Sequence, residues 1–411
     1  GTLGRIILLG AIMKSLETLF GSADINSFEL QADFEQAVEA CKNNIINKKA
    51  DSALVNAKSV RFDFGGNSLP PSRFYSVLGS ARIECFFNRG SAKRLVVFFS
   101  GARTRNGGRD LAPFPTFSSW SWGAETKASV LCIDDPMFYN YPALPLGWFN
   151  GTEKEDYREY VASLVCEISR LLGVQNRDIT LYGRSGGGTA AIAVCSFISE
   201  SSAVAINPQL DIAKYPYNEK FTPITGINTS DEAFLKRNNF ENIIKQHKKN
   251  TFLIISNVAS KIDYDIDINF LSAKFGANLK YGLSCMDNLC LWQYYACGEP
   301  DPHSAFDNPA LFRMIMAVLE LIKAKNIDGA ALLASFANEY WADRYELLMR
   351  KREINQKAVS RGEEIKALKD QISEKEKVIS EKNKEISALK KRMHESLFAK
   401  IRRALRKLFN K

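Results

Sequence analysis

Residues 183–189, Gly-Arg-Ser-Gly-Gly-Gly-Thr, place one serine inside a run of glycines. The apolar residues 179–182 before the run predict a short strand, and the small residues 189–197 after it predict a helix. Gly-x-Ser-x-Gly between a strand and a helix is typical of a nucleophile elbow, whose sharp turn strains the serine and needs neighbours without bulk. A phosphate-binding glycine loop is the alternative, but no Lys-Ser or Lys-Thr follows the glycines. Ser185 is therefore the candidate nucleophile.

A serine hydroxyl needs a base to react at neutral pH, and the base needs an orienting acid. The chain has three histidines. His247 lies at the lysine-rich end of a predicted helix and His394 in a predicted coiled coil, where both are typical of solvated side chains. His303 follows the last predicted strand and comes after the serine in the chain, so it is the candidate base.

The acid is expected between the serine and the histidine, because Ser, Asp/Glu, His is the chain order that accompanies a nucleophile elbow. Asp263, Asp265 and Asp267 all follow the predicted strand 251–255. We favour Asp263 because it lies nearest the end of that strand, and Asp265 is the alternative. Asp301 is interpreted as a turn residue.

A tetrahedral intermediate needs backbone N–H donors around its oxyanion. The elbow supplies the amide of Gly186, and the loop after the predicted strand 94–100 supplies that of Ala102 or Arg103. Arg103 and Arg105 are alternatively interpreted as ligands of an anionic substrate group or a cofactor phosphate.

Further candidates for substrate binding lie around the predicted elbow. These are Arg105, Arg184 beside the serine, and Trp148 in the aromatic segment 137–151. The alternatives are that Arg184 caps the polar surface of the site and that the aromatic side chains fill the core. No metal site and no permanently bound cofactor are expected.

The elements that must position these residues alternate along the chain. Buried or half-buried strands are predicted at residues 60–64, 82–87, 94–100, 129–133, 179–182, 203–206, 251–255 and 291–296, and helices at 153–172, 189–197, 231–247, 269–275 and 309–323. Alternation of this kind favours an α/β fold with a mostly parallel central sheet and helices on both faces.

The end of the chain has a different composition. Ile365, Ile372, Ile379 and Ile386 repeat every seven residues, which predicts a C-terminal helical coiled coil and a homo-oligomer; a single solvated helix is the alternative. Residues 396–411 predict an amphipathic helix with six cations and no acid, suited to an anionic membrane surface. RNA or a protein partner are alternative ligands of this tail.

Composition narrows the class of protein. Six of the nine net positive charges fall in the tail, so no nucleic-acid-binding surface is indicated elsewhere.

The eight cysteines are scattered and form no Cys-x-x-Cys pair, which fits reduced cysteines in the cytoplasm; Cys285 and Cys290 are the one candidate pair for redox or ligand chemistry. No apolar run is long enough to span a membrane. We expect a cytoplasmic protein, or one peripheral on the inner membrane face.

Five segments are predicted from these patterns. They are a leader at 1–12 that precedes Met13, an N-terminal extension at 13–81, an enzymatic α/β domain at 82–323 with an insertion at about 210–250, a helical and coiled-coil region at 324–395, and a basic amphipathic helix at 396–411. The insertion is interpreted either as a lid or as a surface subdomain without a gating role.

Gly183-Arg184-Ser185-Gly186-Gly187, the acid loop at Asp263 and the late His303 make residues 82–323 resemble the α/β-hydrolase superfamily. With Leu146-Gly147-Trp148-Phe149, Asn207-Pro208-Gln209, the coiled coil and the basic tail, the chain also resembles α/β-hydrolase-like proteins of bacterial capsule and surface-polysaccharide biosynthesis. Some of these are similar to acetyl-CoA-dependent polysaccharide O-acetyltransferases. The resemblance implies an α/β-hydrolase fold, acetyl-CoA as co-substrate, and a polysaccharide or acyl ester as substrate.

Residues and resemblance together predict a serine acyl-transfer enzyme with a Ser-His-Asp triad. The expected reaction is O-acetyl transfer to, or ester hydrolysis on, a bacterial surface or capsular polysaccharide, and a general carboxylesterase is the alternative. A hypothesis from another class is a non-catalytic scaffold of a membrane-associated glycan-biosynthesis complex. The joint presence of Ser185, Asp263 and His303 argues against the scaffold.

Overall fold

The computed structural model describes residues 55–105, 110–117, 119–125, 127–276, 281–295, 303, 309–335, 337–338, 380–383, 385 and 387. By its internal contacts the chain divides into two units, Gly1–Tyr345 and Glu346–Lys411. The predicted leader, most of the coiled coil and the basic tail lie outside the described residues. The elements below belong to the first unit.

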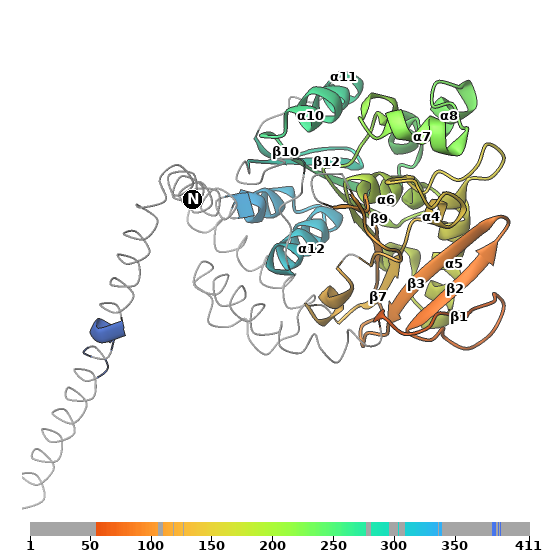
Figure 1. Ribbon diagram of the computed structural model, residues 1–411. Helices are drawn as coiled ribbons and strands as arrows, with labels where there is room; N and C mark the ends of the chain where they lie inside the picture. Colours follow the sequence, from red (N-terminus) through yellow and green to blue (C-terminus); the bar gives the residue numbers. More distant parts are fainter. Residues whose placement is uncertain are drawn as a thin grey trace, which may run out of the picture. The chain divides into compact units, whose positions relative to one another are not determined.

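A ten-stranded sheet forms the centre of this unit (Figure 1). In spatial order its strands are β1 (Val60–Arg61), β2 (Arg73–Leu78), β3 (Ala81–Asn88), β7 (Ser129–Ile133), β4 (Leu95–Phe99), β8 (Ile179–Arg184), β9 (Ser202–Ile206), β10 (Thr251–Asn257), β12 (Leu289–Tyr294) and β11 (Gly282–Met286). The six strands from β7 to β12 run parallel, and β3 and β11 are antiparallel to their neighbours in this group. A separate hairpin pairs β5 (Thr104–Arg105) with β6 (Asp110–Leu111).

Helices occupy the connections. They are α4 (Met137–Asn140), α5 (Tyr157–Leu172), α6 (Gly186–Ser196), α7 (Asn218–Thr225), α8 (Glu232–Arg237), α9 (Phe240–Gln246), α10 (Lys261–Asp263), α11 (Asn269–Phe275) and α12 (Pro309–Lys323). Short 3-10 turns lie at η3 (Trp120–Glu125), η4 (Asn176–Asp178) and η5 (Ile212–Lys214), and η6 (Tyr264–Ile268) is a π-helical turn.

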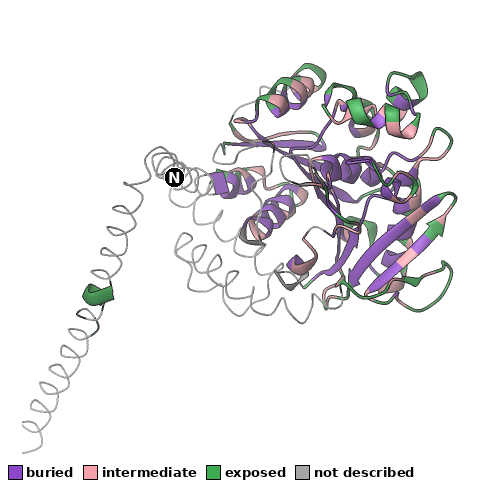
Figure 2. Cartoon of the chain, in the orientation of Figure 1, coloured by how far each residue is buried: buried purple, intermediate pink, exposed green. Residues whose placement is uncertain are grey.

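The strands are apolar on both faces because the sheet separates two cores. In β4, Val97 and Phe99 pack with α5 and α6, whereas Val96 and Phe98 pack with α12 and η3. Alternate side chains of a strand point to opposite faces, so one apolar run serves both cores. Figure 2 shows the central sheet and α6 as buried. The predicted α/β architecture with helices on both faces of a mostly parallel sheet is therefore observed.

Several predicted boundaries need correction. β1 and β2 join the main sheet, so the sheet begins before the boundary predicted at residue 82. Ala330, Leu333, Ala334 and Ala337 pack into the core with α12, and Asn338 accepts a hydrogen bond from Trp292 Nε1 at 2.8 Å, so the first unit also extends beyond residue 323. The single helix predicted at 231–247 is two helices, because Asn238 ends α8 and the side chain of Asn239 caps the start of α9.

The β11–β12 hairpin was only half predicted, since the sequence indicated β12 alone. Cys285 and Cys290 face each other across this hairpin and form a disulfide. This corrects the expectation that every cysteine is reduced. Among the other described cysteines, three are buried and Cys166 is exposed.

Candidate active site

Ser185 occupies the turn between β8 and α6 in a strained conformation. Its φ of 52° and ψ of −129° lie in a region that side chains rarely adopt. The backbone N–H of Ser185 donates to the carbonyl of Ile206 on the neighbouring strand β9 at 2.8 Å, which holds the turn against the sheet. A Cβ on Gly183 would lie 2.1 Å from the carbonyl oxygen of Gly187, and a Cβ on Gly187 would lie 2.6 Å from that of Phe99. The elbow therefore requires glycine at both positions.

The structure brings together the three residues that the sequence singled out. Ser185 Oγ lies 2.7 Å from His303 Nε2, and His303 Nδ1 lies 2.7 Å from Asp263 Oδ1. The side chain of Asp263 is fully buried, whereas that of His303 is 15% exposed. Asp265, the alternative acid, is exposed.

Asn207 holds the histidine segment from a position directly after β9. Its Nδ2 donates to the carbonyl oxygen of His303 at 3.1 Å and to the hydroxyl of Tyr294 at 3.2 Å. Its Oδ1 accepts from the backbone N–H of Asn257 at 2.8 Å, which ties β9 to β10. The φ of Asn207 is 43°, a left-handed conformation that asparagine tolerates better than most residues. No role in the site was predicted for Asn207, although its position directly after a buried strand is a signal that could have indicated one.

The oxyanion donors proposed from sequence receive different support. Gly186 is the first residue of α6, so its N–H has no partner within the helix and lies at the positive end of the helix dipole. The loop after β4 runs beside the serine, because a Cβ on Gly101 would lie 4.0 Å from Ser185 Cβ. Ala102 follows directly in that loop. The N–H of Arg103 instead donates to the carbonyl of Pro145 at 3.0 Å, which corrects the choice of Arg103 as a donor.

The side chain of Arg103 is also engaged within the protein. It is buried, and its guanidinium donates to the carbonyls of Leu144 at 3.1 Å, Ala112 at 3.0 Å and Pro142. Burial lowers the pKa of this guanidinium, although the nearby carboxylates oppose the effect. The guanidinium braces the loop 142–145 and is not a substrate anchor, which corrects that alternative. The side chain of Arg105 lies outside the described residues.

Trp148 is a core residue in this structure, which corrects its prediction as a substrate-binding residue. Its side chain is fully buried, its Nε1 donates to Gln209 Oε1, and its ring packs against Phe221 with the ring centroids 5.5 Å apart. Arg184 is partly buried beside the elbow, with its guanidinium 5.6 Å from the centre of the Trp122 ring. Its role as a substrate ligand stays a prediction.

The loop that carries Trp148 is organised by Asp135, which directly follows β7. One oxygen of Asp135 accepts from the N–H groups of Gly147 and Phe149 at 3.1 Å each, and the other accepts from Met137 N at 3.0 Å. Burial raises the pKa of Asp135 to about 7 in spite of these three bonds. The same loop places Leu146 against the elbow, since a Cβ on Gly186 would lie 2.4 Å from Leu146 Cδ1. Asp135 therefore fixes the loop whose Leu146 lies against the elbow.

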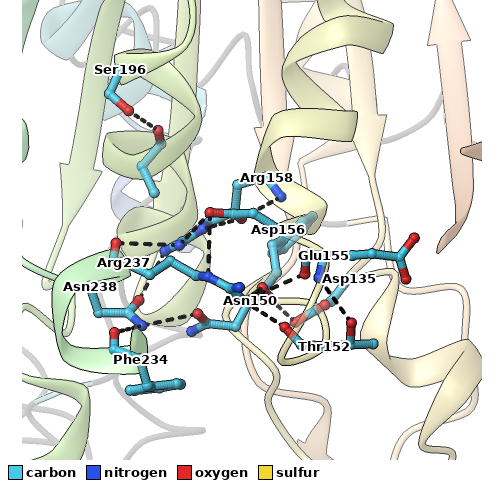
Figure 3. Close-up of polar contacts among 12 residues, drawn as sticks. Asp135, Asn150, Thr152, Glu155, Asp156, Arg158, Ser196, Phe234, Arg237 and Asn238 are labelled. Carbon is cyan, nitrogen blue, oxygen red and sulfur yellow. Dashed lines mark hydrogen bonds and ion pairs between the residues drawn. The ribbon is translucent and has the colours of Figure 1, made fainter. Parts of the chain in front are cut away.

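The insertion after β9 is fastened to the body of the unit (Figure 3). Arg237 at the end of α8 donates to the carbonyls of Asn150 and Thr152 at 2.9 and 2.7 Å. Arg158 in α5 is buried, forms a two-bond ion pair with Asp156, and donates to Asn238 Oδ1 at 2.9 Å. These bonds join α8 to the segment that follows Trp148. The insertion predicted at about 210–250 is thus anchored at this edge, as a subdomain would be.

A serine on the turn between a parallel strand and a helix, followed by an acid after β10 and a histidine after β12, defines the α/β-hydrolase fold. The arrangement can move a proton from the serine to the histidine while the buried acid stabilises the imidazolium. No group of side chains in the described part of the chain has the composition of a metal site. None of its helices combines the length and apolar character needed to cross a bilayer.

The chain was compared with protein families, curated proteins and solved structures. No protein-family model and no curated protein matched the sequence. One similar structure is the Glycosylation Associate Protein (Gap123) complex from Streptococcus agalactiae, with 15% identity over 64% of this chain and 48% of that chain and a TM-score of 0.44. Another is the capsule O-acetyltransferase of Neisseria meningitidis serogroup A, with 17% identity over 62% of this chain and 97% of that chain and a TM-score of 0.43. A third is Porphyromonas gingivalis dipeptidyl peptidase 4, with 14% identity over 63% of this chain and 35% of that chain and a TM-score of 0.38. The chain thus spans about half of the Gap123 chain that it matches. At this level of similarity a shared substrate does not follow.

Proposed function

We propose that the protein is a serine acyl-transfer enzyme in which Ser185 carries the acyl group. The observation that carries the proposal is the relay from Ser185 Oγ to His303 Nε2 and from His303 Nδ1 to Asp263, with both distances at 2.7 Å. The strained elbow supports it further, because backbone strain of this kind is concentrated at functional sites.

In the first half-reaction, Ser185 Oγ attacks the carbonyl carbon of the acyl donor while His303 Nε2 takes the hydroxyl proton. The resulting oxyanion is held by the N–H of Gly186 and by that of Ala102. When the bond to the leaving group breaks, the histidine gives its proton to the departing alkoxide or thiolate, and an acyl-serine remains. Asp263 stays ionised and stabilises the imidazolium throughout.

In the second half-reaction, a hydroxyl attacks the acyl-serine while His303 removes its proton, and the histidine returns this proton to Ser185 Oγ as the bond between Oγ and the acyl carbon breaks. If the hydroxyl belongs to a sugar, the product is an O-acylated glycan; if it belongs to water, the product is a free acid. We propose O-acetyl transfer from acetyl-CoA to a polysaccharide as the first choice, on the sequence resemblance described above. Hydrolysis of an acyl ester is the alternative outcome of the same chemistry.

The decisive experiment is intact mass spectrometry after incubation with acetyl-CoA, combined with turnover of an activated acetyl ester. We expect one acetyl adduct on Ser185 and loss of turnover by on the order of 10³-fold or more in Ser185→Ala, since removal of a serine nucleophile has effects of that size or larger. Ser196→Ala is the matched control, because Ser196 ends the same helix α6 and its hydroxyl only donates to a carbonyl of that helix. Undiminished ester turnover in Ser185→Ala would refute the proposal. Radiolabel passing from acetyl-CoA to added polysaccharide distinguishes transfer from hydrolysis.

A further inference from the structure

A second buried carboxylate lies behind the candidate catalytic acid. The hydroxyl of Tyr215 lies 3.1 Å from Asp263 Oδ1, the oxygen that faces His303, and it also contacts Asp267 Oδ2. Asp267 Oδ1 accepts from the backbone N–H of Leu210 at 2.7 Å. Asp263 and Asp267 both have 0% exposure and Tyr215 has 3%. One tyrosine hydroxyl thus bridges two buried acids.

The proton count of this cluster is constrained. Tyr215 has one proton to donate, and two buried acids compete for it. Among the described residues no lysine or arginine forms an ion pair with either acid, and His303 is the one ion-pair partner of Asp263. Two ionised carboxylates this close are strongly disfavoured in a buried site. One of the two acids must therefore hold a proton at neutral pH.

The geometry selects Asp267 as the acid that is protonated. Asp263 is paired with a histidine that becomes cationic during the reaction, whereas Asp267 faces Tyr215 and a backbone amide. The charged groups around Asp267 are Asp263 and, from the segment before η5, Asp211, whose charge is partly balanced by Lys214 at 2.7 Å. Burial, with the two neighbouring carboxylates, raises the pKa of Asp267 well above its usual range, and the hydrogen bonds from Tyr215 and Leu210 offset only part of this.

We propose that neutral Asp267 and Tyr215 are positioning residues for the triad: Asp267 donates its proton to the Tyr215 oxygen, and Tyr215 donates to Asp263. This inference rests on the proposed function and deepens it. Asp263 Oδ1 contacts both His303 and Tyr215, whereas Asp263 Oδ2 accepts no hydrogen bond from the described residues. Tyr215 is therefore the second side-chain donor to this carboxylate, beside His303. A polarised chain of donors of this kind stabilises the ionised form of Asp263 and fixes its orientation toward the histidine.

The test compares Tyr215→Phe with Asp267→Asn. The first removes the donor to Asp263, which makes that carboxylate a stronger partner for the imidazolium. We expect turnover to fall about tenfold, the acidic limb of the pH–rate profile to move up by roughly half a unit to one unit, and the NMR resonance of the His303 Nδ1 proton to shift. Asparagine can donate to Tyr215 and accept from Leu210 as the neutral acid does. Asp267→Asn is therefore expected to leave all three readouts close to those of the unmodified protein.

Tyr217→Phe is the matched control, because the Tyr217 hydroxyl lies 3.1 Å from Thr104 Oγ1 and makes no contact with the acids. Unchanged readouts in Tyr215→Phe, or a fall in turnover without movement of the pH limb and the proton resonance, overturn the inference. Movement of both in Asp267→Asn overturns it as well, because it shows that Asp267 is charged. The NMR measurement needs no substrate, so it decides the inference even if Ser185→Ala leaves ester turnover intact and the proposed function fails.

Discussion

At the residue scale, four buried aspartates, two directly after β7 and two in the helical turns after β10, are each satisfied in a different way. Asp134 accepts from the hydroxyls of Thr116 and Tyr139, and Asp135 accepts from backbone amides. Asp263 faces the histidine and Asp267 shares the tyrosine. Partners of these different kinds leave different acids protonated at neutral pH, so the same residue type can brace a loop in one place and carry charge in another.

The first of these acids makes stability depend on pH. Burial raises the pKa of Asp134 from 3.8 to about 6. Between these values the folded protein keeps a proton that the unfolded chain has lost, so this stabilising contribution is complete below about pH 4 and is lost as the pH rises toward 6. The unfolding free energy of the unmodified protein, measured with urea, should therefore fall as the pH rises through this range. In Asp134→Asn we expect this fall to be smaller by roughly 1–3 kcal/mol. Asp63→Asn is the control, because Asp63 is exposed. Parallel curves for the Asp134 variant and the unmodified protein would contradict the expectation.

The three residues of the relay were predictable because few alternatives existed. The chain offers three histidines, and chain order placed one of them after the serine and the acid. Arg103 and Trp148 were misassigned because their partners are carbonyl and amide groups of segments distant in the sequence, and no local pattern records such contacts. Asp267 was one of the three candidate acids, but its contact with Tyr215 was not predicted, for the same reason. They lie 52 residues apart and meet only through the fold.

At the element scale, the insertion shows that the sequence of a segment does not by itself predict how the segment packs. The insertion predicted at about 210–250 was interpreted either as a lid or as a surface subdomain, and α8 is bound to the loop after Trp148 through backbone carbonyls. The strands were predicted more reliably than this segment, because continuous apolar runs indicate strands buried on both faces. Amphipathic edges carry weaker signals, and β2 and β11 were missed accordingly.

Arg237 is the residue that should control the attachment of the insertion. In Arg237→Ala, the carbonyls of Asn150 and Thr152 lose a charged donor, and we expect unfolding to become easier by roughly 2–4 kcal/mol. Hydrogen exchange should rise in α8 and α9 more than in the central strands. Arg61→Ala is the control, since Arg61 is more than half exposed and pairs with exposed Asp63 two residues away. Exchange in α8 that matches the unmodified protein would show that the anchor has no such role.

At the scale of the whole molecule, most of the net positive charge and the candidate catalytic residues lie in different parts of the chain. The relay lies between residues 185 and 303, whereas the last sixteen residues hold six of the nine net positive charges. We propose that this basic tail is the part that meets a membrane. The homo-oligomer expected from the heptads of the coiled coil stays a prediction as well.

A chain lacking residues 396–411 is expected to lose binding to phosphatidylserine vesicles, because each cation near an anionic surface contributes about 1 kcal/mol. Vesicle sedimentation measures the binding, and neutral phosphatidylcholine vesicles are the control. Turnover of a dissolved ester should be unchanged, because the tail lies far beyond His303 in the sequence. Retention of the shortened chain on anionic vesicles would rule out the tail as the anchor.

The position of β4 in the middle of the sheet has a consequence for how the protein reaches its native state. Its neighbours β7 and β8 are distant in sequence, and the pairing of Leu95 with Ile179 closes a loop of 84 residues, the difference between the two numbers. When two strands far apart in the sequence pair, the chain loses conformational entropy before their contacts stabilise it. Such pairs therefore form slowly. On a ribosome, β7 becomes available to pair with β4 before β8 does, so the second edge of β4 is covered only when β8 arrives together with the elbow that carries Ser185.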